Sequence, residues 1–344
     1  MIDPIAFFPQ DTPVAALPNW KAPRLLFPVG SPRQQWRATS LYPAFRQSGV
    51  AYKLVLRIMA TAGCTRTRLA PGKWLLEDLI DESFPGCASL SVLVGTPGPA
   101  QKITVELRDP YQRVMAYLKC AERLPALRRL RRERDVLTAI PAGMGPAVLG
   151  YLSLGTMEVL ITEPIQGKAP GSTLPVPMPA LHLGERMVIP HPLYPLDQHP
   201  WVRQLGGAFV RPVERWMDAL SSCSWPVAVQ HGDFAPWNIR CSLQGPGIAI
   251  DWEYGFAEGF PYLDVAYYVL QVGALIYRWS PGKAAGAAAN VLIRSLGLSE
   301  PQAKALVGLA SYVSYQEALK DEHTDQNFLQ MWRRAVWEGD WWKD

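Results

Sequence analysis

The stretch "HGDFAPWN", residues 231–238, places an acid and an amide at a spacing that suits metal-assisted chemistry. Asp233 precedes Asn238 by five positions, and Asp251 follows in "IAIDWEYG" after one expected hairpin. Two short antiparallel strands would bring Asn238 and Asp251 together at the open end of that hairpin, with Asp233 on the loop leading in. Phosphoryl transfer needs such a group, because one carboxylate accepts a hydroxyl proton while an amide and a second carboxylate bind Mg²⁺. An ordinary Asx turn is the structural alternative for Asp233 and Asn238.

The order H-x-D-x-x-x-x-N followed by an Asp on the next strand is the kinase catalytic-loop signature. "HGDFAPWNI" together with "IAIDWEYG" resembles the aminoglycoside phosphotransferase and choline kinase superfamily, whose members are small-molecule kinases with a protein-kinase-like fold. The resemblance implies that Asp233 is the catalytic base and that Asn238 and Asp251 hold Mg²⁺. Gly232 replaces the Arg usual in protein kinases, and no A-P-E-like segment follows Asp251, so a protein kinase is disfavoured.

The resemblance also implies a nucleotide-binding lobe upstream of this motif. Lys119, in "VMAYLKC" on the third expected strand, is the candidate that reaches the α- and β-phosphates of ATP. Lys102, at the start of the second strand, is the alternative. Glu133, on the helix that follows, would pair with the lysine, unless it forms an ordinary i,i+4 surface pair.

Two backbone segments complete the expected nucleotide site. Gly95 and Gly98 lie in "VGTPGPA", a turn that would cover the phosphates, although its two prolines have no N–H to donate. The segment around Glu163 and Ile165 would serve as a hinge whose backbone bonds the adenine. By itself, the glycine turn would be interpreted as a simple hairpin.

Several neighbours of the motif have structural interpretations of comparable weight. His231 is expected to brace the loop by hydrogen bonding, and Asp264 is expected to be a helix cap or a loop anchor. Four aromatic residues could enclose a quaternary ammonium, stack on a sugar ring, or simply pack around the loop: Phe234, Trp237, Trp252 and Tyr254.

The elements that must position these residues follow from hydrophobic periodicity. Three strands with short turns are expected between 88 and 121, then a helix over 124–139 and two further strands. The proline-rich segments 1–35 and 168–200 are expected to be irregular, and the chain from 201 onward is expected to be mainly helical. The fold class is therefore α+β, a protein-kinase-like two-lobe fold with a five-stranded antiparallel N-lobe sheet, one helix and a mainly helical C-lobe. The expected domains are an N-terminal extension of unknown role (1–87), a nucleotide-binding N-lobe (88–167) and a C-lobe with the catalytic loop (168–344).

Composition narrows the functional class of the protein but does not identify the molecule that accepts the phosphate. The chain has 344 residues, 49% of them hydrophobic, and a formal net charge of +4, so a nucleic-acid binder is not indicated. The basic run "LRRLRRERD" (127–135) is interpreted as a solvated helix face, with phosphate contact as the alternative. Five scattered cysteines and no apolar run long enough to span a membrane favour a soluble, cytoplasmic protein.

The expected function is an ATP- and Mg²⁺-dependent phosphotransferase that acts on the hydroxyl of a small molecule. An amino alcohol, an aminoglycoside and a sugar all remain open as acceptors, and the oligomeric state is not readable. The alternative is a catalytically silent nucleotide-binding or regulatory protein with the same fold.

Overall fold

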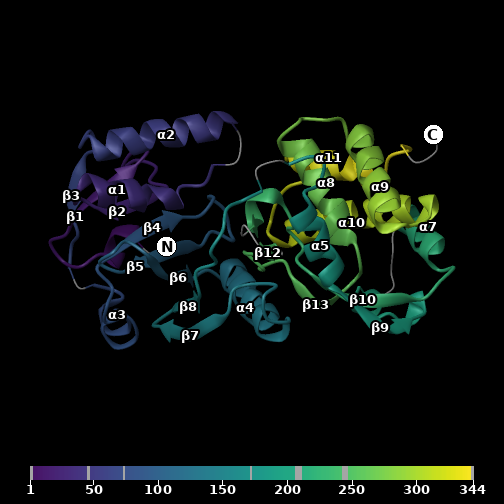
Figure 1. Cartoon of the computed structure of the whole chain (residues 1–344), viewed down its shortest axis with the longest axis horizontal. Coiled ribbons are helices and arrows are strands. Elements are labelled where there is room, and N and C mark those ends of the chain that lie inside the picture. Colours follow the sequence, from purple (N-terminus) through teal and green to yellow (C-terminus); the bar gives the residue numbers. More distant parts are fainter. Residues whose placement is uncertain are drawn as a thin grey trace. The chain divides into compact units, whose positions relative to one another are not determined.

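The computed structural model describes residues 3–44, 47–72, 74–170, 173–205, 211–241 and 247–341. The chain divides into two compact units (Figure 1). The first comprises Met1–Leu130 and Ala147–Pro164, and the second comprises Arg131–Pro146 and Ile165–Asp344.

The first unit is built on one eight-stranded antiparallel sheet of order β3-β1-β2-β4-β5-β6-β8-β7. Strands β4 to β8 are the five that hydrophobic alternation predicts, so that part of the expectation is confirmed. The expected sheet size is wrong, because three strands from the N-terminal region extend the sheet. The strands are β1 Pro13–Leu17, β2 Leu25–Pro28, β3 Thr67–Leu69, β4 Ser89–Val94, β5 Ile103–Arg108, β6 Val114–Ala121, β7 Val148–Leu154 and β8 Met157–Thr162.

Short helical segments cover the sheet of the first unit. They are η1 Pro4–Phe7, α1 Pro32–Ala38, η2 Thr39–Leu41, α2 Gln47–Thr61 and α3 Glu77–Ser83. One sheet face carries a buried cluster that includes Val105 and Leu118 and is packed by Phe7 and Ile80 from the N-terminal region. Successive side chains of a strand point to opposite faces, so Lys119 lies on the other face from Leu118.

Helix α4 (Leu124–Ala139) follows β6 and continues from the first unit into the second. Its basic run is not a solvated face throughout, which corrects the sequence-based interpretation. Arg129 is buried, with 5% of its surface exposed. Arg132 donates from Nε to the carbonyl of Gly255 at 2.8 Å and from Nη1 to Glu317 Oε2 at 2.8 Å. These bonds make Arg132 a fixed structural contact within the second unit.

The second unit is mainly helical, with a three-stranded sheet of order β13-β10-β9 and the hairpin β11-β12. Residues 168–200 are not irregular as expected, because they contain α5 and β9. Helix α8 is buried along nearly its whole length, which accounts for its almost continuous apolar sequence. The elements are α5 Met178–Arg186, β9 Val188–Tyr194, η3 Leu196–Gln198, α6 Pro200–Gln204, α7 Arg211–Leu220, β10 Trp225–Gln230, η4 Pro236–Asn238, β11 Ile239–Arg240, β12 Ile248–Ala249, β13 Phe256–Gly259, α8 Leu263–Leu275, α9 Pro281–Leu296, α10 Glu300–Lys320 and α11 Phe328–Trp337.

Candidate active site

The loop after β10 is clamped by Asp264, in the first turn of α8. The buried Asp264 carboxylate accepts the backbone N–H of His231 at 2.5 Å and that of Gly232 at 2.9 Å. Burial raises the pKa of Asp264 to about 6, and the two backbone N–H groups oppose that rise. Asp264 is therefore the loop anchor that the sequence suggested.

The start of the loop is further fixed by the His231 ring. Its Nδ1 accepts the N–H of Asp233 at 3.2 Å, and Nε2 lies 2.9 Å from the carbonyl oxygen of Ile250. Since a neutral imidazole has one donor and one acceptor, Nε2 carries the proton in this arrangement. The expected bracing role of His231 is confirmed.

Gly232 cannot carry a side chain at its position in the loop. Its φ is +77°, and a Cβ would lie 2.3 Å from the carbonyl oxygen of Tyr254. The left-handed conformation strains any residue with a Cβ, and a backbone atom cannot move aside cheaply. This explains why the motif reads H-G-D and not H-R-D in this chain.

Gly232→Ala should destabilise the second unit by about 2–5 kcal/mol, combining left-handed strain with overpacking. Gly297→Ala is the matched control, because Gly297 has a φ of +67° in the same unit with nothing within 4 Å of its Cβ position. The control should cost only about 1–2 kcal/mol in left-handed strain. Urea denaturation of both variants measures the difference, and equal losses would contradict the steric account.

Asp233 is held through both carboxylate oxygens. Tyr267, on α8, donates its hydroxyl to Asp233 Oδ1 at 2.8 Å. Asn238 donates Nδ2 to Asp233 Oδ2 at 2.8 Å and to the Asp233 carbonyl at 2.9 Å. Because both partners of the amide nitrogen are acceptors, Asn238 must direct Oδ1 elsewhere, where that oxygen can serve a cation.

Asp251 lies next to Asn238 through the hairpin, as its spacing predicts. Ile239 pairs with Ala249, and the N–H of Ile250 donates to the Asn238 carbonyl at 2.8 Å. The expected turn residues 245 and 246 lie outside the described part of the chain. Asp251 itself adopts a left-handed φ of +69°, a conformation that Asp tolerates better than most residues.

Asn238 and Asp251 fit a magnesium ion by the chemistry of their oxygen atoms. Mg²⁺ binds hard oxygen donors and takes only one or two carboxylates from a protein, with waters and phosphates completing its shell. Among the residues that the structure describes, no cluster of three or more His, Cys, Asp or Glu forms a metal site. One amide and one carboxylate match the few protein ligands that a nucleotide-bound Mg²⁺ takes.

The electrostatics of the loop suit a proton acceptor. Burial raises the pKa of Asp233 to about 7; the charges of Asp251 and Glu253 add to the rise, and hydrogen bonds from Tyr267 and Asn238 oppose it. Burial and the charge of Asp233 raise the pKa of Tyr267 as well, so its hydroxyl stays protonated as a donor. A base with a pKa near the working pH is the most effective one.

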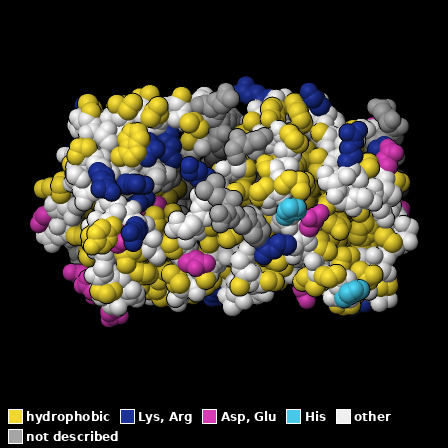
Figure 2. Space-filling view, in the orientation of Figure 1, with side chains coloured by type: hydrophobic (Ala, Val, Ile, Leu, Met, Phe, Trp, Pro, Cys, Tyr) yellow, Lys and Arg dark blue, Asp and Glu magenta, His cyan; other side chains and the backbone are white. Residues whose placement is uncertain are grey.

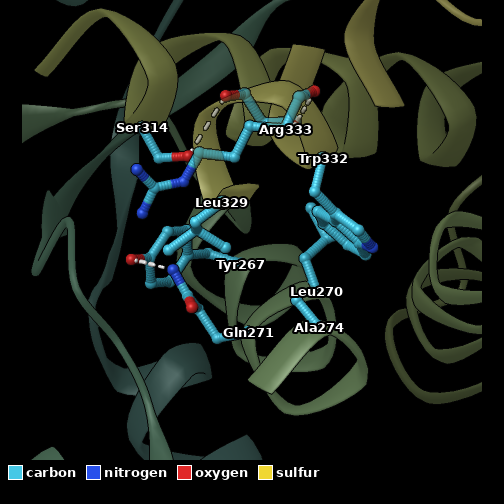
Figure 3. A pocket seen from close by; sticks show the side chains of 9 residues that line it. Tyr267, Leu270, Gln271, Ala274, Ser314, Leu329, Trp332 and Arg333 are labelled. Atoms are coloured by element: carbon cyan, nitrogen blue, oxygen red, sulfur yellow. Dashed lines mark hydrogen bonds between the residues drawn. The ribbon is translucent and has the colours of Figure 1, made fainter. Parts of the chain in front are cut away.

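A small cavity lies beside Tyr267, between helices α8, α10 and α11 (Figure 3). It has room for about one water molecule. Gln271 also bonds the Tyr267 hydroxyl, while its Oε1 and Arg333 Nε are buried without a hydrogen-bond partner among the described residues. Sequence reasoning missed Tyr267, Gln271 and Arg333, and the one signal was a Gln inside an otherwise apolar helix.

Glu133 is fully buried and bonds the segment after Asp251. Its Oε1 accepts the N–H of Trp252 at 3.1 Å.

Phe234 and Trp252 are also fully buried and pack on the His231 ring, at centroid distances of 6.1 and 4.7 Å. These two aromatic residues are therefore part of the loop's packing and do not form a ligand box.

The remaining candidate residues lie mostly in the first unit. Lys119 is on β6, paired with Thr104 on β5 and Leu160 on β8, which is the third of the five expected strands. Lys102 immediately precedes β5. The structure thus gives Lys119 an interior strand position, whereas Lys102 lies at a turn.

The expected phosphate turn lies in the connection between β4 and β5, residues 95–102. Gly95 donates its N–H to the Lys102 carbonyl at 2.8 Å, and a Cβ on Gly95 would lie 2.6 Å from that same oxygen. Gly98 has a φ of +153° and open space at its Cβ position. The Gly95 N–H is therefore already bonded within the turn.

The expected hinge coincides with the boundary between the two compact units. The first unit ends at Pro164 and the second resumes at Ile165. Glu163 exchanges two hydrogen bonds with Ala147, from its own N–H at 3.0 Å and to its Oε1 at 2.9 Å. These bonds fix the end of β8 just before the chain crosses to the second unit.

Comparison with solved structures defines the fold. The chain is similar to the ethanolamine kinase Pv091845 of Plasmodium vivax, with a TM-score of 0.50, 12% identity, and coverage of 90% of this chain and 94% of that one. A Ralstonia eutropha protein provisionally described as an aminoglycoside phosphotransferase matches with a TM-score of 0.44, 16% identity, and coverage of 78% and 96%. No protein-family model and no curated protein sequence matches this chain.

The likeness to the ethanolamine kinase concerns the fold, an α+β architecture with a large antiparallel sheet and many helices. It confirms the expected fold class, in which an antiparallel sheet is followed by a mainly helical part.

Proposed function

We propose that the protein is an ATP- and Mg²⁺-dependent phosphotransferase that transfers the γ-phosphate to a hydroxyl of a small molecule. One observation carries the proposal: Asp233 is fixed through both oxygens by Tyr267 and Asn238, while Asn238 directs Oδ1 away from these bonds and shares one hairpin with Asp251. A structural Asx turn does not need a tyrosine hydroxyl on the acid or a second carboxylate on the same hairpin. The likeness of the fold to an ethanolamine kinase supports phosphoryl transfer as the chemistry of this group.

Each residue of the loop has a distinct role in the proposed step. Asp233 orients the acceptor hydroxyl and takes its proton, and Tyr267 keeps the carboxylate in the productive orientation. Asn238 and Asp251 would hold Mg²⁺, which when bound offsets negative charge on the nucleotide phosphates. The Glu133 side chain accepts the backbone N–H of Trp252 and so holds the segment that carries Asp251.

The nucleotide contacts are proposed by resemblance and by strand position. Lys119 binds the α- and β-phosphates, and the backbone around Glu163 and Ile165 bonds the adenine. In the turn from Gly95 to Gly98, the Gly98 end is the part whose backbone is open to a phosphate.

The cavity beside Tyr267 has room for about one water molecule and is too small to receive the acceptor. Gln271 Oε1 and Arg333 Nε, which have no partner among the described residues, offer an acceptor and a donor for such a water. An amino alcohol, an aminoglycoside and a sugar therefore all stay open as acceptors.

Tyr267→Phe should lower the rate of phosphoryl transfer by about 10–100-fold, because it removes one hydrogen bond of about 1.5–3 kcal/mol from the Asp233 carboxylate. Nucleotide affinity should not change. The adjacent Tyr268→Phe is the matched control, since Tyr268 is equally buried but its hydroxyl has no partner among the described residues. Single-turnover rates that fall alike in both variants would remove Tyr267 from the proposed mechanism.

A catalytically silent nucleotide-binding protein is the second candidate. It is favoured by the phosphate turn, where the Gly95 N–H is already bonded and Pro97 and Pro99 have none. Thermal-shift measurement with ATP and Mg²⁺ tests binding, and ATP consumption over a panel of amino alcohols and sugars tests turnover. Stabilisation by ATP without turnover on any acceptor would favour the silent protein.

A further inference from the structure

Helix α2 (Gln47–Thr61) presents apolar side chains on the face that points away from the protein. Within this helix Leu56 and Ala60 are the buried side chains, and they pack on α1 and on strands β1 and β2. Six large apolar side chains on the opposite side are exposed, from 40% for Met59 to 54% for Ile58. They are Val50, Tyr52, Leu54, Val55, Ile58 and Met59, which we call the α2 face.

The two cationic side chains of α2 bond to backbone carbonyls of the segment 36–40. On an ordinary surface helix the charged side chains face solvent and the apolar ones pack on the protein. Lys53 donates from Nζ to the Ser40 carbonyl at 2.7 Å. Arg57 donates to the Trp36 carbonyl at 2.9 Å and lies over the Trp36 ring at 4.1 Å. Helix α2 therefore bonds to its own unit through its charged side chains and leaves a stripe of apolar side chains exposed. An exposed apolar stripe of this kind marks a surface that binds another apolar medium.

The surroundings of the α2 face are strongly basic. Between Asp11 and Glu77 the sequence has ten Lys and Arg residues and no Asp or Glu. Figure 2 shows Lys and Arg side chains beside the hydrophobic ones along the α2 edge of the first unit. Among the described residues of this group, the exposed ones are Lys21, Arg33, Arg37, Arg66 and Arg68.

Four acidic residues of the first unit gather on α3. Helix α3 carries Glu77, Asp78, Asp81 and Glu82, and Figure 1 places α3 and α2 at opposite edges of the unit. Glu106 lies near Lys53 of α2, but it is buried and paired with Arg108, so it adds no exposed negative charge there. The apolar and basic surroundings of α2 suit a surface that faces anions.

We propose that the α2 face lies on an anionic membrane surface, with its apolar side chains in the headgroup–acyl boundary and the surrounding Lys and Arg on lipid phosphates. Helices that lie in this interface combine an apolar stripe with basic neighbours. The helix lies on the bilayer and does not cross it: none of the described helices is long and apolar enough to span one. This inference is independent of the proposed reaction.

Charge favours a lipid surface over a second copy of the chain. Two copies joined through their α2 faces would bring two basic surfaces together without acids between them, and like charges at an interface are unfavourable. Anionic headgroups would instead neutralise the same residues, at about 1 kcal/mol for each basic residue near the surface.

Sedimentation of the full chain with vesicles tests the proposal. Vesicles of phosphatidylcholine alone are compared with vesicles that also contain phosphatidylglycerol, at low and high salt. Val55→Glu/Ile58→Glu removes the apolar stripe, and Arg33→Glu/Arg37→Glu inverts part of the basic rim. Leu149→Glu is the matched control, because Leu149 is 53% exposed on β7, in the same unit but outside α2.

The wild type and Leu149→Glu should bind the anionic vesicles alike, and high salt should weaken that binding. Both α2-side variants should bind at least about tenfold more weakly with unchanged thermal stability. Absence of binding to anionic vesicles, equal binding to phosphatidylcholine alone, or equal loss in Leu149→Glu would overturn the proposal. The proposal would also be overturned if light scattering showed a wild-type dimer that dissociates in Val55→Glu/Ile58→Glu. The α2 face would then be a contact with a second copy of the chain.

Discussion

Asp233→Asn is expected to lower phosphoryl transfer by about 10²–10⁴-fold, the contribution of a general base, while nucleotide binding stays nearly intact. The amide has the volume of the carboxylate but cannot accept the hydroxyl proton. Its oxygen can still accept from Asn238, and its nitrogen can donate to the Tyr267 hydroxyl, so the loop keeps its bonds. Initial rates and the thermal shift produced by ATP with Mg²⁺ measure the two effects separately.

The matched control for this variant is Glu258→Gln, the same change of acid to amide at an exposed position on β13. It should leave both rate and binding unchanged. Turnover retained in Asp233→Asn would remove Asp233 from the role of base. Loss of nucleotide binding together with turnover would instead indicate that the change disrupted the site as a whole.

Asp251→Ala is expected to weaken Mg²⁺-dependent nucleotide binding by at least about 10–100-fold, because it removes the one carboxylate in the proposed metal pair. Binding of ATP without Mg²⁺ should change little. Since Asp251 has a φ of +69°, Ala at this position also adds backbone strain, and Asp251→Asn separates the two effects. Asn tolerates the conformation and keeps one oxygen but loses the charge.

Calorimetric titration of ATP with and without Mg²⁺ distinguishes the outcomes. If both Asp251 variants lose Mg²⁺-dependent affinity, the carboxylate charge is required at this site. If only Asp251→Ala loses affinity, the effect comes from the backbone. An unchanged metal dependence in both variants would contradict the assignment of Asp251 as a ligand.

The catalytic loop and the five strands β4 to β8 were predictable because their signals are local. Alternating apolar residues define each strand, and Asp233, Asn238 and Asp251 are linked by one hairpin whose geometry follows from its length. The Gly in H-G-D was readable as an unusual residue, but its reason was not. Only the fold shows that the Tyr254 backbone occupies the space of a Cβ.

The strands β1 and β2 and the partners of the base were not predictable. The N-terminal strands are short and separated by prolines, and their burial comes in part from pairing with strands distant in the sequence. Tyr267 was hidden for a related reason, because α8 is buried along nearly its whole length and carries two adjacent tyrosines, of which only the fold shows the one that reaches Asp233.

The most direct test of the proposed function is a mass-shift screen. The protein is incubated with ATP, Mg²⁺ and a mixture of amino alcohols, aminoglycosides and sugars, and products are compared with those formed by Asp233→Asn. We expect a compound heavier by one phosphate group that forms with the wild type and is absent with the variant. Formation of no such compound from any acceptor, by a wild-type protein that ATP and Mg²⁺ stabilise, would contradict the assignment of a kinase.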